Sequence, residues 1–183
     1  MRRSLAITMA VLMCDVAVGA AATDGTKGAL RAPDRVVERV REHVGAATHT
    51  LVRVVGADDF QAEPWQRVKH LVAFRIHRHG QGGTPTTDPV TYLVATSSLY
   101  LKAAGALRNG TTNHEYVWCL LAAVLAHEAA HTGANTERQA LTAEVEQLRR
   151  CLFAGHLHAA DGWGGVSYLG KVEAKLRNPH EHY

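Results

Sequence analysis

The feature that most constrains this chain is an apolar run, residues 113 to 131, that carries two histidines and a glutamate near its end. His127, Glu128 and His131 form the motif H-E-x-x-H. At 3.6 residues per turn, positions four apart share one face of a helix, so both imidazoles can point toward the same atom. Burying such polar groups costs free energy unless they are paired or coordinated. The run therefore predicts a buried helix with a polar site near its end.

The predicted helix has a start signal and a stop signal in the sequence. Asn113 can cap the free amides of the first turn, where the charge of Glu115 also favours the helix dipole. Gly133 is a residue that commonly ends a helix, because it adopts the left-handed conformation without a steric penalty. The motif is therefore expected in the last turns of this helix.

The spacing of the motif is typical of a zinc site in which His127 and His131 bind the metal. Glu128 follows His127 directly and can act as a general base toward the water at the zinc. Zinc sites that carry out hydrolysis keep three protein ligands and one position for water, so a third ligand is required. The motif therefore predicts a zinc-dependent peptidase whose third ligand comes from elsewhere in the chain.

Residues 134 to 153 are predicted to form a second helix. Asn135 or Thr136 can cap its start, and Gln139 can complete a capping box from Thr136. The connection from the first helix is short, so the two helices should form an antiparallel hairpin. The far end of the second helix is then expected beside the start of the first.

Two glutamates of the second helix are candidates for the third zinc ligand. Glu137 and Glu144 are seven residues apart and share one face of the helix. In the hairpin, the midpoint of the two motif histidines is level with Leu141, which lies between these glutamates. The spacing alone leaves both open, and each also has an ordinary interpretation. Glu137 would favour the helix dipole, and Glu144 would occupy a solvated position.

The same hairpin brings Cys119 and Cys151 level with each other, because the midpoint between them is residue 135, inside the predicted turn. Packed helix axes lie about 8–10 Å apart, which leaves facing Cα atoms close enough for a disulfide. A disulfide between these two cysteines is therefore predicted at the far end of the hairpin.

Residues 90 to 150 resemble the core of the gluzincin metallopeptidases, particularly the CAAX-prenyl-protease-like branch. In that family a strand and a short helix precede the H-E-x-x-H helix, and the third zinc ligand lies in an E-x-x-A segment of the next helix. Residues 137 to 140 match this segment, so the resemblance implies Glu137 as the ligand and keeps Glu144 in reserve. Leu141 departs from the family, which commonly has an aspartate there supporting a ligand histidine.

A rival assignment places the same residues in the metzincin register H-E-x-x-H-x-x-G-x-x-H, with Glu137 in place of the last histidine. This register requires a glycine at Ala134, but the glycine is Gly133. All three methionines lie within the first 13 residues, so the methionine turn of that family has no counterpart here. Both assignments name Glu137 as the third ligand.

Length and composition fit a single domain behind an export signal. The chain has 183 residues, 46% of them hydrophobic, and its net charge of +3 is too small to indicate nucleic-acid binding. Residues 1 to 22 combine arginines, an apolar run and small residues, as in a secretory signal peptide, and Asp15 interrupts the run too early for a membrane span. Met13 disfavours Cys14 as a lipoprotein anchor. Residues 23 to 183 would retain two cysteines, which suits an oxidising compartment.

The remaining periodicity predicts an α+β fold in which a short β-sheet packs on the motif helix, as in a small zincin-like domain. Helices are expected over residues 32–44, 99–107 and 166–176, and strands over residues 49–57, 68–79 and 89–97, with a loop at residues 79–89. An extended peptide substrate can pair with the edge of such a sheet, so strand 89–97 or strand 68–79 is the candidate edge of the cleft.

Three C-terminal side chains are candidate donors to a developing oxyanion: His156, His158 and Tyr168. A peptide or protein is the expected substrate. Two other functions remain open from the sequence alone. The hairpin could hold zinc without catalysis in a binding or regulatory domain, or it could be a metal-free structural hairpin closed by the disulfide.

Overall fold

The computed structural model describes residues 34–44, 51–79, 85–110, 114–132, 136–157 and 165–178. This part of the chain forms six α-helices, one short 3-10 helix and a three-stranded sheet, so the predicted α+β class is confirmed. In chain order the elements are α1 (Arg35–Val44), β1 (Leu51–Val55), η1 (Ala57–Asp59), α2 (Ala62–Val68), β2 (Ala73–His79), β3 (Pro85–Val94), α3 (Ser98–Asn109), α4 (Glu115–Ala130), α5 (Glu137–Phe153) and α6 (Gly165–Arg177). The predicted signal peptide, residues 1 to 22, lies outside the described residues.

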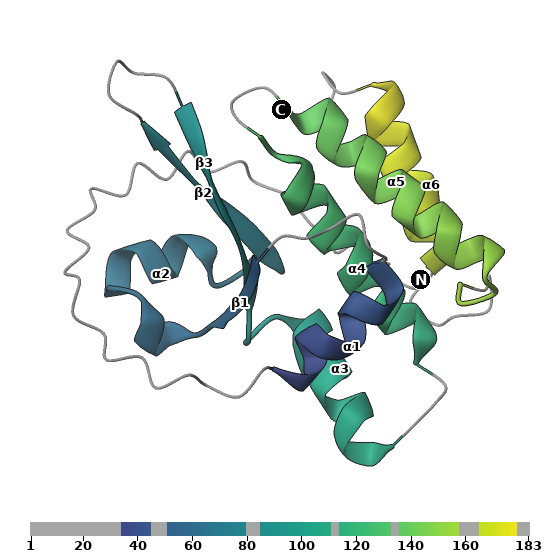
Figure 1. Cartoon of the computed structure of the whole chain (residues 1–183), viewed down its shortest axis with the longest axis horizontal. Coiled ribbons are helices and arrows are strands. Elements are labelled where there is room, and N and C mark those ends of the chain that lie inside the picture. Colours follow the sequence, from purple (N-terminus) through teal and green to yellow (C-terminus); the bar gives the residue numbers. More distant parts are fainter. Residues whose placement is uncertain are drawn as a thin grey trace, which may run out of the picture.

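Helix α4 is the centre of the fold, because its alanine, leucine and valine residues are apolar on every face. Its residues 117–123 and 125–127 are all buried, as expected for a helix that is hydrophobic all round. The sheet and α2 lie on one side of α4, and α5 and α6 lie on the other (Figure 1). Helices α1 and α3 also pack against α4. None of the described helices is long and apolar enough to cross a membrane.

The sheet has the strand order β1-β3-β2, with β3 parallel to β1 and antiparallel to β2. Successive side chains of a strand point to opposite faces, and β3 uses both faces for packing. Leu93 belongs to the main core with α4, whereas Val94 packs in a smaller cluster with Trp65 and Val68 of α2. The sheet is therefore covered by α2 on one face and by the helical part on the other (Figure 1).

The strand boundaries correct three predictions. Strand β2 begins at Ala73 rather than at residue 68, because residues 62–68 form helix α2, which the sequence pattern did not predict. Strand β3 begins at Pro85, inside the predicted loop, because it pairs with β2 as far as His79. Strand β3 is central, so its prediction as the edge of the cleft is wrong, whereas β2, like β1, is an edge strand of the sheet.

Helices α4 and α5 form the predicted hairpin, and a disulfide joins Cys119 to Cys151 with their Cα atoms 6.0 Å apart. Both cysteines are buried in the main core. The bridge therefore fixes the end of the hairpin that is opposite to the H-E-x-x-H motif.

Replacing both cysteines with alanine is expected to lower the free energy of unfolding substantially. The bridge spans 32 residues, and releasing a loop of that length increases the entropy of the unfolded chain by an amount worth about 3–4 kcal/mol. Urea unfolding of the variant and of the oxidised and reduced wild type measures this loss. Equal stability in oxidised and reduced wild type would contradict it.

Candidate metal centre

The H-E-x-x-H motif lies where α4 ends and the chain turns toward α5. Helix α4 ends at Ala130, and His131 already has an extended backbone with φ −69° and ψ 105°. The helix thus stops before the predicted end at Gly133, which lies outside the described residues, as does the predicted cap Asn113. His127 and His131 are nevertheless neighbours, with ring centroids 5.0 Å apart.

Three side chains converge here in a way that could hold a metal ion: His127, His131 and Glu137. Oε2 of Glu137 lies 3.7 Å from Nε2 of His127 and 3.6 Å from Nε2 of His131. Ligand atoms about 2.0–2.1 Å from a tetrahedral zinc are about 3.3 Å from one another. The two measured separations are therefore close to the edges of such a tetrahedron.

Two of the atoms that face each other in this group, one on His127 and one on Glu137, lack hydrogen-bond partners among the described residues. Nε2 of His127 and Oε2 of Glu137 are both buried, and neither makes a hydrogen bond within the part of the chain that the structure describes. Buried polar atoms are nearly always paired in native proteins, because an unpaired one costs about 1–3 kcal/mol. A cation bound between these atoms would satisfy both of them, so the residues fit a metal ion.

The opposite side of each imidazole is held by another side chain. Nδ1 of His127 donates to Oε2 of Glu144 at 2.8 Å, and Nδ1 of His131 is 3.0 Å from Oγ1 of Thr136. The proton on Nδ1 of His127 leaves its Nε2 with a free lone pair, which is the form that binds a metal. Glu144 thus orients the ring of His127.

The position of Glu144 corrects its ordinary interpretation as a solvated residue, because it is only 4% exposed. Its Oε1 accepts a hydrogen bond of 2.5 Å from the hydroxyl of Tyr168 on α6. Burial of Tyr168 and the charge and hydrogen bond of Glu144 raise the pKa of this tyrosine well above its usual value. Tyr168 therefore stays protonated and supports Glu144, and it is corrected from an oxyanion donor to a positioning residue.

Thr136 also differs from its predicted role. It precedes α5, but its side chain does not cap the helix, so the predicted capping box with Gln139 is wrong. The hydroxyl contacts His131 instead. Asn135, the other predicted cap, lies outside the described residues. Thr136, just before α5, thus lies on the outer side of the site, and Glu137, the first residue of α5, lies at its centre.

Glu128 lies beside these groups with an altered acidity. Burial is the main cause that raises the pKa of Glu128. The charges of Glu137 and Glu144 raise this pKa further, whereas those of His127 and Arg75 lower it, and the resulting pKa is about 7. A carboxyl group with a pKa near neutrality can accept and return a proton under ordinary conditions, as general acid–base catalysis requires. The environment thus fits the base role predicted for Glu128.

Strand β2 is fixed to the same end of α4. Arg75 donates from Nη1 to the backbone oxygen of His131 at 3.1 Å and from Nε to Oγ1 of Thr91 at 3.1 Å. A hydrogen bond from a guanidinium group is among the stronger ones, so it holds β2 against the backbone of His131 at the end of α4.

The remaining candidate residues do not gather at this centre. His156 lies against His43, with ring centroids 5.6 Å apart, and both are grouped with Glu115 in the first turn of α4. Its prediction as an oxyanion donor is therefore corrected, because α5 carries it to the opposite end of α4. His158 lies outside the described residues.

Sequence reasoning missed the supporting roles of Thr136, Tyr168 and Arg75. The sequence does contain a signal for the role of Glu144. This residue lies two turns after Glu137 on the same helix face, so the two carboxylates can contact opposite sides of one imidazole ring. No local pattern marks Tyr168 or Arg75, since their roles depend on how α6 and β2 pack.

Comparison of the chain with family models, with curated proteins and with solved structures finds no match.

Proposed function

We propose that this chain is an exported zinc-dependent metallopeptidase of the gluzincin type. His127 and His131 provide two ligands and Glu137 the third, with Glu144 assigned to orient His127. Imidazole and carboxylate groups are the usual ligands of catalytic zinc, and three of them leave one position open for water or substrate.

A single observation carries the proposal: two buried atoms that could share a cation face each other without another partner. Nε2 of His127 and Oε2 of Glu137 are 3.7 Å apart, and neither has a hydrogen bond among the described residues. The Nδ1 atom of His127 is meanwhile engaged by Glu144. The outer nitrogen of His127 is thus hydrogen-bonded, while its Nε2 and the Glu137 Oε2 that faces it are not, within the described part of the chain. This arrangement supports metal binding between the two unpaired atoms.

In the reaction, zinc would supply a Lewis acid for the scissile carbonyl and for the attacking water. Glu128 would take a proton from that water and pass it to the leaving amine, which its pKa of about 7 allows in both directions. Glu144 would keep the His127 ring in place throughout through its hydrogen bond to Nδ1, and Tyr168 would hold Glu144 through its hydroxyl.

A peptide substrate is supported by the position of strand β2. Among the described strands, β2 pairs with β3 alone, so its other edge has main-chain groups that an extended peptide can bind. The bond from Arg75 to the His131 carbonyl holds this strand beside the metal-binding residues. A peptide paired with β2 would therefore pass close to Glu128.

One alternative is favoured by a specific observation. Two of the predicted oxyanion donors have other partners, because Tyr168 donates to Glu144 and His156 lies beside His43. A domain that binds zinc without hydrolysis would need no such donor. The alternative therefore shares the metal site and differs only in turnover.

The experiment that tests the proposal combines metal removal with a cleavage assay. We expect the purified protein to cleave members of a quenched-fluorescent peptide library, to lose this activity on treatment with a chelator, and to regain it when Zn²⁺ is added. Cleavage that survives chelation would contradict the metal mechanism. Zinc bound through His127 and His131 without any cleavage would establish the non-catalytic domain instead.

A further inference from the structure

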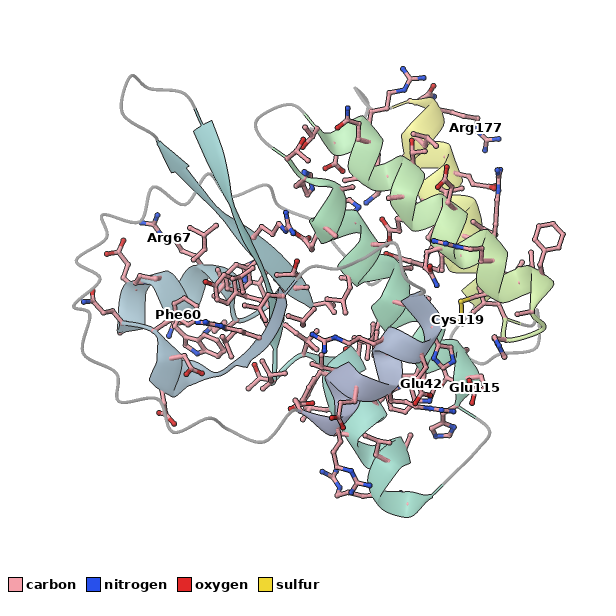
Figure 2. All side chains as sticks on the ribbon, viewed as in Figure 1. Glu42, Phe60, Arg67, Glu115, Cys119 and Arg177 are labelled. Carbon is pink, nitrogen blue, oxygen red and sulfur yellow. A yellow bond between two sulfur atoms is a disulfide. The ribbon has the colours of Figure 1, made fainter. Side chains whose placement is uncertain are left out.

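A second group of metal-binding side chains lies at the other end of α4, beside the disulfide. His43 ends the last turn of α1, Glu115 begins α4, and His156 follows α5. Glu115 lies at the end of α4 near α1, with Cys119 close by (Figure 2). Glu115 precedes His127 by 12 residues, which along a helix is a distance of about 18 Å. This group is therefore separate from the centre described above.

The three side chains converge in space. Each of them offers one ligand atom, and these atoms all lie within 4.8 Å of one another. Nε2 of His43 is 2.7 Å from Oε2 of Glu115, and the ring of His156 packs edge-on against His43. Zinc ligands are separated by about 3.3 Å, so an ion fits once the closer pair of atoms moves apart and the wider pairs move together, by about 1.5 Å at most.

The hydrogen bonds of His43 leave its inner nitrogen facing a carboxylate. Its Nδ1 lies 3.3 Å from the backbone oxygen of Arg39, which can only accept, so Nδ1 carries the proton. In a neutral imidazole Nε2 then has a lone pair, which would be directed at the Glu115 oxygen. Two acceptors in contact require a positive species between them, which is either a second proton or a metal ion.

The backbone that carries each ligand is fixed in place. Gln147 on α5 donates to the backbone oxygen of His43 at 2.8 Å, and the backbone N–H of His156 donates to the backbone oxygen of Cys151 at 2.9 Å. Arg39 donates to Oε1 of Glu115, which leaves Oε2 directed at His43. Preorganised ligands lose little conformational freedom on binding, which favours a metal over a mobile ion pair.

We propose that His43, Glu115 and His156 form a second site for a divalent transition metal such as Zn²⁺, one that clamps α1 and the end of α5 to the start of α4. Two imidazoles and a carboxylate are ligands that zinc accepts. The site joins three segments that are far apart in the sequence, so its role is structural. It does not depend on the proposed peptidase activity.

The test is a Zn²⁺ titration of the chelator-treated full chain, followed by calorimetry and by metal analysis after dialysis. Wild type is expected to bind two equivalents. The paired variant His43→Gln with His156→Gln should bind one, and so should His127→Gln with His131→Gln. His70→Gln is the matched control, since His70 is exposed in a turn, and it should bind two like wild type.

Thermal melts make the result independent of any folding defect in the variants. In the His127→Gln, His131→Gln background, added Zn²⁺ should raise the melting temperature, because a ligand that binds only the folded state stabilises it. The single change His156→Gln in that background should abolish the rise. A His43→Gln, His156→Gln protein that is folded and still binds as much Zn²⁺ as wild type would overturn the second site. If only the His127, His131 variant lost Zn²⁺ binding, the second site would also be overturned. If only the His43, His156 variant lost Zn²⁺ binding, the proposed peptidase centre would be overturned instead.

Discussion

Replacing Glu128 with glutamine is expected to lower kcat for peptide cleavage by about 10²–10⁴-fold, the usual contribution of a general base. Glutamine has nearly the same shape as glutamate but cannot take a proton from water. Zinc content should be unchanged, because the assigned ligands are His127, His131 and Glu137. Steady-state kinetics at saturating peptide, together with metal analysis of the same sample, measure both quantities.

The matched control for this variant is Glu146→Gln, which removes the same charge from an exposed position of α5. It should leave kcat unchanged. The Glu128 variant should also be no less stable than wild type, because burial is the main cause that raises the pKa of Glu128 to about 7 and so disfavours its charged form. Undiminished cleavage by a folded, zinc-loaded Glu128→Gln protein would remove Glu128 from the mechanism.

The helices of the hairpin were predictable because their pattern is strong and local. An apolar run of that length with the motif near its end favours a buried helix, and α4 is one. The short connection between the helices is enough to place Cys119 opposite Cys151, and the disulfide between them is present. Features that depend on one helix and its neighbour in the sequence were thus accessible without a structure.

The elements of the sheet were less predictable, because their patterns are short and overlap with others. Helix α2 has only seven residues, and its last residue, Val68, also continues the alternation of the strand that follows. Pro85 and the two threonines after it are typical of a loop, but pairing with β2 places them in β3. In both places a tertiary contact outweighed local preference.

Within the site, the residues that failed prediction are those whose partner comes from another element. Local rules made Thr136 a helix cap and Glu144 a solvated residue, yet each bonds to a motif histidine. The same rules could not place His156, since its neighbours are set by where α5 ends relative to α1. The spacing of the motif was therefore enough to predict that His127 and His131 lie together. Their hydrogen-bond partners could be identified only from the three-dimensional structure.

Glu137 and Glu144 of α5 are expected to respond differently when each is replaced with glutamine. Glu137→Gln should weaken Zn²⁺ binding at the motif histidines by more than about 100-fold, because it removes the charge of a ligand atom that faces both imidazoles. Glu144→Gln should weaken it only about 10–100-fold, the usual effect of losing an outer partner. Its amide oxygen can still accept from His127, while its amide nitrogen donates to the hydroxyl of Tyr168.

Competition with a chromophoric chelator measures both affinities, in proteins that carry His43→Gln and His156→Gln so that only the motif site is titrated. The order of the two losses decides the third ligand. Glu144 lies on the Nδ1 side of His127, 2.8 Å away, whereas the Glu137 oxygen lies within 3.7 Å of both Nε2 atoms. The Glu144 carboxylate is thus placed to orient the His127 ring, and the Glu137 carboxylate is placed to bind one ion together with both imidazoles. A larger loss in Glu144→Gln than in Glu137→Gln would show that the side chains exchange these roles when zinc binds.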